Sequence, residues 1–155
     1  MNDPYPALGR VTSGIYILTA GQGDLATGML ASWVMQAGFE PPMVTVAVRQ
    51  GRYVADWLTE GQPFNLNIVA DAQKHLLKHF GKGFEPGEPA FEGFHISICD
   101  NGVPALVEAV GHLECEPQSH LDSGDHRIVL ARVVRGLLVN DLPPMVHLRK
   151  SGANY

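Results

Sequence analysis

Two long runs of β-forming residues surround a four-residue turn in the C-terminal third, and this pair most limits the folds open to the chain. The run 109–118 alternates apolar and polar residues, and the run 127–139 is dominated by β-branched and aliphatic residues. The turn between them is Ser123-Gly124-Asp125-His126, a cluster typical of tight connections. The pattern predicts a long antiparallel hairpin whose turn presents the imidazole of His126 beside the carboxylate of Asp125.

Shorter runs predict further strands and two helices. β-Branched and aliphatic content predicts strands over 11–20, 43–48, 64–69 and 96–99. Apolar spacing predicts one helix over 53–60 and another over 71–80, with Asp71 as the N-cap of the second. The segment 82–92 is rich in Pro, Gly and Glu and is expected to be a loop. The final residues, from 147 onward, are polar and expected to be irregular.

The segment 21–39 is compatible with two different folds. A Gly-x-Gly-x-x-Ala motif at 21–26 follows a strand and satisfies a loose dinucleotide fingerprint of the Rossmann type. The residues after it include Thr, Gly, Ser and Val, which are mediocre helix formers, whereas that fingerprint needs a helix there. The alternative takes 21–24 as a hairpin turn and 25–34 as the returning strand. The β-rich second half favours this alternative, a closed antiparallel barrel with two or three helices outside it.

Composition excludes several classes of function. The 155 residues suit one domain, expected over 1–155, and the net charge of −5 offers no basic footprint for nucleic acid or an anionic membrane. No apolar run reaches membrane-spanning length, and the spacing of Cys99 and Cys115 does not allow a Cys-x-x-Cys pair, so the chain is expected to be cytoplasmic. Only 17% of the residues are charged, which indicates that a partner, a second copy or a ligand covers part of the surface.

Four segments, taken in order, resemble a known family. They are Thr27-Gly28-Met29-Leu30-Ala31-Ser32-Trp33-Val34, Pro41-Pro42-x-Val44-Thr45-Val46-Ala47-Val48, Phe64-Asn65-Leu66-Asn67-Ile68 and the Ser-Gly-Asp-His turn. These segments are similar to those of the flavin reductase-like proteins, which have an FMN-binding split β-barrel, a mainly β (α+β) fold of antiparallel Greek-key type. The ending His147-x-Arg149-Lys150-Ser151-Gly152 is similar to that of the flavin reductase module of cyanobacterial diflavin flavoproteins.

The resemblance implies a set of cofactor contacts. The segment Met29, Leu30, Ala31, Ser32 and Trp33 would run along the isoalloxazine and offer backbone amides and carbonyls to its pyrimidine edge. Residues after the next strand, Ala47, Val48, Arg49 and Arg52, would hold the ribityl chain and phosphate. Arginine suits a phosphate because its guanidinium forms paired hydrogen bonds. The other interpretation is an ordinary buried strand followed by two solvated arginines.

Three more residues are candidates for the same site. Asn67 lies inside an apolar strand, where its amide needs partners, and either a cofactor or the backbone could supply them. Lys82 is expected near the phosphate or the nicotinamide, with a solvated loop lysine as the alternative. His126 resembles the family's Gly-Asp-His histidine, which lies close to the flavin and the nicotinamide. There it would orient the reductant or place positive charge near the reduced flavin.

A metal is not expected. His75 and His79 share a helical spacing, but no His-Glu-x-x-His frame exists, and nothing fixes the geometry of His112, His120, Asp122 and His126. The function implied is an NAD(P)H-dependent flavin reductase that binds FMN, or FAD, and uses NADH or NADPH. Its electrons would pass to an acceptor protein, free flavin or oxygen, and the family implies a homodimer with the flavin near the interface. The alternatives are an electron-transfer module that never meets nicotinamide and a Rossmann-type enzyme.

Overall fold

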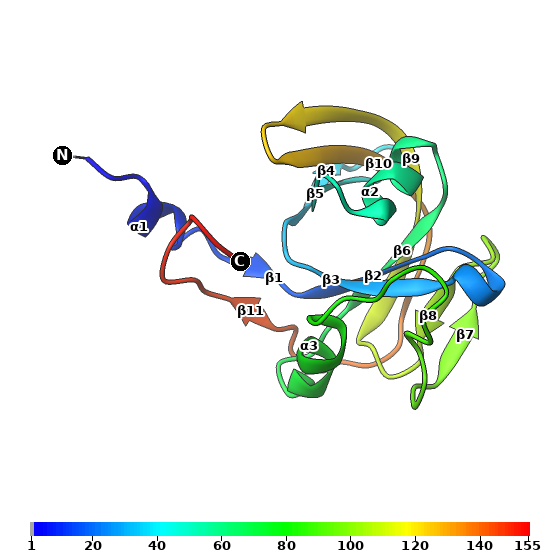
Figure 1. The fold of residues 1–155 in the computed structure, drawn as a ribbon. Coiled ribbons are helices and arrows are strands. Elements are labelled where there is room, and N and C mark those ends of the chain that lie inside the picture. The colour runs from blue at the N-terminus through cyan, green and yellow to red at the C-terminus, as the bar shows by residue number, and fades with distance from the viewer. Residues whose placement is uncertain (1) are drawn as a thin grey trace.

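A computed structural model describes residues 2–155, and a single antiparallel sheet of seven strands dominates it (Figure 1). The strand order is β3-β2-β6-β9-β10-β5-β4, and every neighbouring pair is antiparallel. The strands are β2 (Tyr16–Ala20), β3 (Thr27–Ala31), β4 (Val34–Gly38), β5 (Met43–Arg49), β6 (Phe64–Ile68), β9 (Gly111–Ser123) and β10 (His126–Leu138). The mainly β fold expected from the sequence is confirmed.

The two edges of this sheet are consecutive in the chain. β3 forms one edge and β4 the other, and only Ser32 and Trp33 separate them. The sheet must therefore curl until its edges meet, which makes it a barrel. Close to the junction, the amide of Ala47 on β5 donates to the carbonyl of Trp33 at 3.0 Å. β3 and β5 are not paired as strands, so the barrel is split between them.

The long hairpin expected from the sequence is the largest unit of the sheet. β9 and β10 pair from His126 opposite Ser123 to Leu138 opposite Gly111, with irregularities after Leu130 and after Val133. Gly124 occupies the turn with a φ of +75°, a conformation that favours glycine because it has no Cβ. β9 extends to Ser123, further toward the turn than the sequence indicated, because the backbone ladder with β10 continues through the exposed residues 119–123.

Two groups of apolar side chains form the core. One fills the barrel and includes residues that are at most 1% exposed: Leu18, Val46, Val48, Phe64, Leu66 and Val129. The other lies between the barrel and α3 (Lys74–Phe80) and includes Ile15, Ile17, Val69, Leu76, Phe80 and Leu106. Burying such side chains is the main favourable term in folding, and here it holds α3 beside β3.

Two helices cover the barrel at the positions expected. α2 (Tyr53–Thr59) buries Val54, Ala55 and Leu58. α3 begins at Lys74 rather than at residue 71, so the expectation that Asp71 is its N-cap is wrong. The Asp71 amide bonds to the Pro143 carbonyl, and Gln73 precedes the helix, with Oε1 accepting from the Ala70 amide and Nε2 donating to the Glu108 carbonyl.

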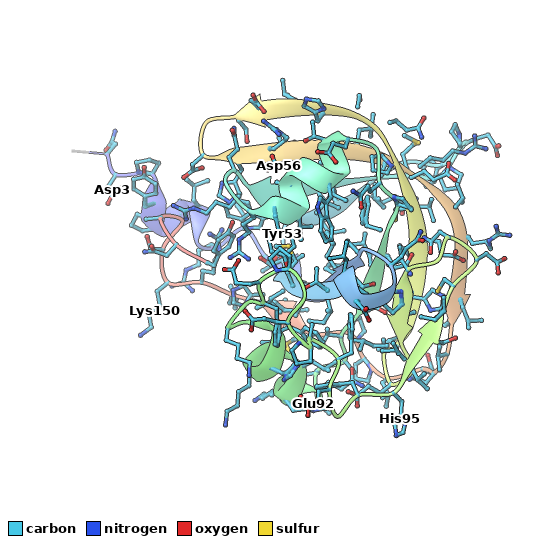
Figure 2. The ribbon with its side chains drawn as sticks, turned by 45° about the vertical axis from the view of Figure 1, so that its right-hand side comes forward. Asp3, Tyr53, Asp56, Glu92, His95 and Lys150 are labelled. Carbon is cyan, nitrogen blue, oxygen red and sulfur yellow. The ribbon has the colours of Figure 1, made fainter. Side chains whose placement is uncertain are left out.

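Short elements at the termini were missed by the sequence analysis. α1 (Tyr5–Leu8), β1 (Ser13–Gly14) and β11 (Val146–His147) form an arm beside the barrel in which the two ends of the chain pair (Figure 1). In Figure 2, Asp3 and Lys150 mark this arm. The predicted strand over 11–20 is therefore two strands.

The other short elements lie within the barrel sequence and beside it. β7 (Ile96–Ile98) was expected, and it pairs with β8 (Pro104–Leu106), which was not. The predicted strand over 25–34 is divided, because η1 (Gly23–Leu25) precedes β3 and the chain crosses to β4 at Ser32. The Rossmann alternative is wrong, since it needs a helix where β3 lies. Among residues 2–155, no helix is long and apolar enough to cross a membrane.

Candidate functional site

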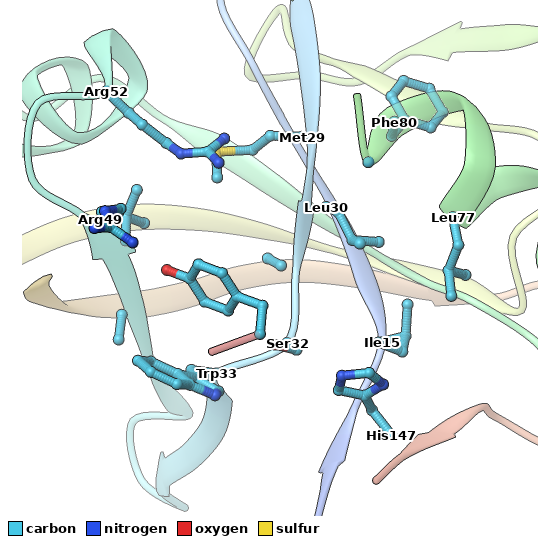
Figure 3. Close-up of a pocket in the computed structure, with 15 residues that line it drawn as sticks. Ile15, Met29, Leu30, Ser32, Trp33, Arg49, Arg52, Leu77, Phe80 and His147 are labelled. Atoms are coloured by element: carbon cyan, nitrogen blue, oxygen red, sulfur yellow. The ribbon is translucent and has the colours of Figure 1, made fainter. Parts of the chain in front are cut away.

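A cavity of about 260 Å³ opens at the split in the barrel, between β3, the end of β5, α3 and the C-terminal arm (Figure 3). It is lined by nine of the cofactor-binding residues expected from the sequence: Met29, Leu30, Ala31, Ser32, Trp33, Ala47, Val48, Arg49 and Arg52. The rest of its lining was not expected: Ile15, Leu77, Phe80, Gly81, His147 and Tyr155. These residues are far apart in the sequence and meet only because the sheet curls.

One wall of the cavity is an edge strand. β3 pairs with β2 on one side only, so its other side carries N–H and C=O groups without a sheet partner. Met29 and Ala31 are at most 9% exposed, which fixes the strand against the core. A row of fixed donors and acceptors beside apolar side chains suits a flat heterocycle, which needs hydrogen bonds at its edge and apolar cover on its faces.

The opposite wall is cationic. Arg49 ends β5, and Arg52 follows the turn at Gly51, which has a φ of +93°. Figure 3 shows the Arg52 side chain reaching toward Met29, and Arg49 on the same side of the cavity as Trp33. Neither arginine has an ion-pair partner within 4.0 Å in the part of the chain that the structure describes. Two uncompensated guanidinium groups in a chain of net charge −5 form a site that attracts an anion such as a phosphate.

A second cavity, of about 490 Å³, continues from the first and shares Met29 and Arg52 with it. Lys82 lines this second cavity and not the first, so the lysine expected near the site lies in the cavity that adjoins Arg52. The loop that carries Lys82 is tied to α2, because the Tyr53 hydroxyl donates to the Phe84 carbonyl at 2.6 Å and lies 3.1 Å from Thr27 Oγ1. Figure 2 shows Tyr53 facing this loop.

His126 lies behind the cavity wall rather than on it. It stands opposite Arg49 in the β5–β10 ladder, is 6% exposed, and its ring centroid is 4.6 Å from that of Trp33. Nδ1 bonds to Asp125 Oδ1 at 2.7 Å, and this hydrogen bond lowers the pKa of the Asp125 carboxyl below its ordinary value. The Asp125 carboxylate can only accept, so Nδ1 carries the hydrogen of this bond, and in that tautomer Nε2 accepts from the Tyr155 hydroxyl. The histidine therefore reaches the cavity through Tyr155.

The turn that carries His126 is held in place by Gln50. Its amide Nε2 donates to the Gly124 carbonyl at 2.9 Å and to the His126 carbonyl at 3.2 Å, and its backbone amide donates to the Asp125 carbonyl. No sequence motif pointed to this glutamine. Because it clamps all three residues, the imidazole is fixed relative to Arg49 on the neighbouring strand.

Asn67 has a structural role, so its expected contact with the cofactor is wrong. It is fully buried in β6 and does not line either cavity. Nδ2 donates to the Ile17 carbonyl at 2.9 Å and to Thr19 Oγ1 at 3.2 Å, and Oδ1 accepts from the Leu106 amide at 2.8 Å. These bonds satisfy the amide and attach β8 to the barrel, which is the backbone-bonded alternative that the sequence left open.

The histidines expected as possible metal ligands do not converge. Among residues 2–155, the one group of at least three potential ligands is Cys99, His112 and Glu114, and none of them lines the cavity. The Glu114 carboxylate in this group already accepts from the Asn101 amide and pairs with Arg135. His75 and His79 have separate partners, Glu108 and the Ala90 carbonyl.

The chain is similar to known proteins over nearly all of its length. The flavin reductase like domain family matches residues 8–154. Diflavin flavoprotein A 1 of Synechocystis sp. is 40% identical over 156 residues, which cover 99% of this chain and 27% of that protein. The chain thus spans about a quarter of the length of such relatives.

Solved structures share the fold. The NADH:FAD oxidoreductase of Streptomyces globisporus superposes with a TM-score of 0.84 at 24% identity, over 94% of this chain and 86% of that one. The styrene monooxygenase flavin reductase of Pseudomonas putida superposes with a TM-score of 0.77 at 26% identity, over 92% of this chain and 90% of that one. Since the family match covers nearly every residue and the barrel is the same, the chain belongs to the flavin reductase-like family.

Proposed function

We propose that the chain is an NAD(P)H-dependent flavin oxidoreductase that binds FMN at the split of the barrel. The observation that carries this proposal is the pairing of an edge strand, β3, with two unpaired arginines across one cavity. The strand suits the polar edge of an isoalloxazine, and the arginines suit a phosphate. Among the structural relatives are a reductase named as an NADH:FAD oxidoreductase and one solved with NADP+, which supports nicotinamide as the reductant here.

Each wall has a separate task in this proposal. The backbone from Met29 to Trp33 orients the ring, and the Ser32 hydroxyl adds one polar contact. Leu77 and Phe80 on α3 exclude water from the other side of the cavity. Arg49 and Arg52 hold the phosphate, and Lys82 extends this positive charge into the second cavity. Two neighbouring arginines match the one terminal phosphate of FMN, so FMN rather than FAD is proposed as the bound flavin.

When bound, the flavin accepts a hydride from a reduced nicotinamide and passes the electrons to an acceptor protein, free flavin or oxygen. The protein groups need no acid or base for this transfer, so their contribution is position. Trp33 backs the cavity, and His126 stands behind it with its ring held by Asp125 and Gln50. An imidazole held in one orientation next to the cavity orients the incoming ligand.

The test is stopped-flow reduction of the FMN-loaded protein by NADH and by NADPH, followed as bleaching of the flavin absorbance. Bleaching with at least one of them is expected. If neither reagent bleaches a flavin that is demonstrably bound, the reductase proposal is refuted and the chain is an electron-transfer module.

The phosphate contacts are tested by replacing Arg49 and Arg52 with alanine, with Arg132→Ala as the matched control. Arg132 is exposed on the same sheet and lines neither cavity. A charge-assisted hydrogen bond is worth about 1.5–3 kcal/mol, so each single substitution should weaken FMN binding roughly 10-fold to 100-fold. Riboflavin has no phosphate, and its affinity should stay the same in all variants. Equal losses for FMN and riboflavin would contradict the assignment.

We also propose that the chain is a homodimer with the flavin near the interface. An apolar groove lies on the other side of Trp33 and shares Ser32, Trp33 and Ala47 with the cavity. Its lining includes Val11 and Met35, which are 64% and 66% exposed. A second copy of the chain would cover these side chains and close the flavin site. Light scattering should give twice the chain mass of 16.8 kDa, and Met35→Glu should shift it to the monomer; a monomeric wild type would overturn this proposal.

A further inference from the structure

The proposed flavin site contains a side chain from the segment that follows β11, here called the tail (residues 148–155). Tyr155 lines the cavity, with its ring centroid 5.2 Å from that of Trp33 and 5.6 Å from that of His126. Its hydroxyl bonds to Nε2 of His126. Burial raises the pKa of this phenol, while Arg52 and Arg49 act in the opposite direction, so the hydroxyl is protonated and able to donate. The Tyr155 side chain thus packs its ring against the indole of Trp33 and bonds through its hydroxyl to Nε2 of His126.

The tail is fixed at its base and loosely held at its end. The Gly152 amide donates to the Tyr5 carbonyl at 2.6 Å, and a Cβ on Gly152 would lie 2.2 Å from Leu8 Cβ, so only glycine fits this contact. Beyond it, the Asn154 carbonyl accepts from Arg149 at 3.0 Å. Tyr155 itself remains 54% exposed. A side chain with so much exposed surface can leave the cavity without unfolding the arm.

The contacts of Tyr155 match what a nicotinamide would need in the same place. If the planar nicotinamide ring replaced the phenol of Tyr155, it would make the same aromatic contact with Trp33. The carboxamide N–H₂ of nicotinamide is a hydrogen-bond donor, and Nε2 of His126 is the acceptor that the phenol now occupies.

We propose that Tyr155 is a gate that occupies the nicotinamide position and is displaced by the reduced cofactor. This inference rests on the proposed reductase function and adds a residue to its site. In the closed state the tyrosine covers Trp33 and holds His126 in one orientation. Entry of the nicotinamide replaces the phenol on both groups, and the tail moves aside from its anchor at Gly152. Only open molecules bind the nicotinamide, so the apparent dissociation constant equals the intrinsic one divided by the fraction of molecules that are open.

The main test compares wild type, Tyr155→Phe and Tyr155→Ala, each loaded with FMN, with Phe39→Ala as the control. Phe39 is 90% exposed and lines neither cavity. The dissociation constant for NADH and NADPH comes from the concentration dependence of flavin bleaching. Tyr155→Phe, which removes a hydrogen bond worth about 1.4 kcal/mol, should tighten binding roughly tenfold, and Tyr155→Ala should tighten it further. A weaker or unchanged affinity in Tyr155→Ala would overturn the gate.

A second measurement needs neither flavin nor turnover. Trp33 and Trp57 are the only tryptophans, so Trp57→Phe leaves Trp33 as the sole emitter. Adding Tyr155→Ala to the flavin-free protein should shift this emission to longer wavelength and make it more accessible to acrylamide. Unchanged emission would show that Tyr155 does not cover Trp33, and would overturn the closed state. If FMN is bound but never bleached while this shift is present, the reductase function fails and the tail contact stands.

Discussion

The hydrogen bonds of Asn67 lead to a prediction that separates a structural residue from a cofactor contact. Replacing Asn67 with alanine removes the acceptor of the Leu106 amide and the donor to the Ile17 carbonyl and Thr19. All four residues are at most 1% exposed, so water cannot take over these bonds without opening the barrel. The variant should therefore be destabilised while its flavin site stays intact.

The magnitude follows from the three bonds. A buried donor left without an acceptor costs about 1–3 kcal/mol, and the Leu106 amide is such a donor. The other two bonds each contribute about 1 kcal/mol, since their acceptors lose one of several partners. The free energy of unfolding should fall by roughly 3–5 kcal/mol, which is a large part of the total for a domain of this size. The attachment of β8 to the barrel should weaken most.

Urea unfolding of wild type, Asn67→Ala and the control Asn140→Ala measures this loss. Asn140 is only partly buried, and its side chain makes one long bond to the Ala109 carbonyl and one to the Leu142 amide. The control should lose about 1 kcal/mol or less. FMN affinity, measured well below the unfolding midpoint, should be the same in all three proteins. A stable Asn67→Ala variant with weak FMN binding would refute this reasoning and return Asn67 to the cofactor site.

Three further predictions concern the core and the loop beside the site. Cys115 is fully buried, and this burial, together with the nearby Glu114 carboxylate, raises its pKa from 9.0 to about 12. Iodoacetamide at pH 8 should therefore modify Cys99 and leave Cys115 intact until the protein is unfolded. Because the thiol of Cys115 has a higher pKa in the folded than in the unfolded protein, its contribution to the free energy of unfolding is complete below about pH 9 and is lost between pH 9 and 12. In urea unfolding, the stability of Cys115→Ala should therefore fall less than that of wild type between these pH values. Equal falls in the two proteins would contradict this prediction. Gly28→Ala places a Cβ 2.7 Å from Phe80 Cε1 and should lower stability by about 1–3 kcal/mol by thermal unfolding, whereas an unchanged midpoint would mean that α3 yields freely. Tyr53→Phe removes the hydrogen bond to the Phe84 carbonyl, so trypsin should cut after Lys82 faster than in wild type; an equal rate would show that the bond does not hold the loop.

Much of the fold could be predicted because its signals are local. The β9–β10 hairpin, β5, β6 and α2 follow from runs of residues with one periodicity, and each of them was expected close to its observed position. The division of 25–34 was missed because Ser32 and Trp33 carry no breaker such as proline or glycine. The chain turns there because it must cross from one edge of the sheet to the other, which is a property of the closed barrel.

The site was predictable only in part, for a related reason. Met29 to Trp33, Arg49 and Arg52 lie in segments that resemble the family, and the cavity brings them together. Tyr155 and His147 come from the terminal arm, and Leu77 from α3, so no sequence spacing relates them to β3. For Asn67 the sequence predicts that a buried amide has hydrogen-bond partners, but it does not predict which groups these are. Here the backbone supplies them.

The central claim is that FMN binds at the split of the barrel, between β3 and the two arginines. A crystal structure of the FMN complex tests it most directly. The isoalloxazine is expected along the backbone of Met29 to Trp33, with the phosphate within hydrogen-bond distance of Arg49 or Arg52. A flavin bound elsewhere, or bound here with its phosphate away from both guanidinium groups, would contradict the account.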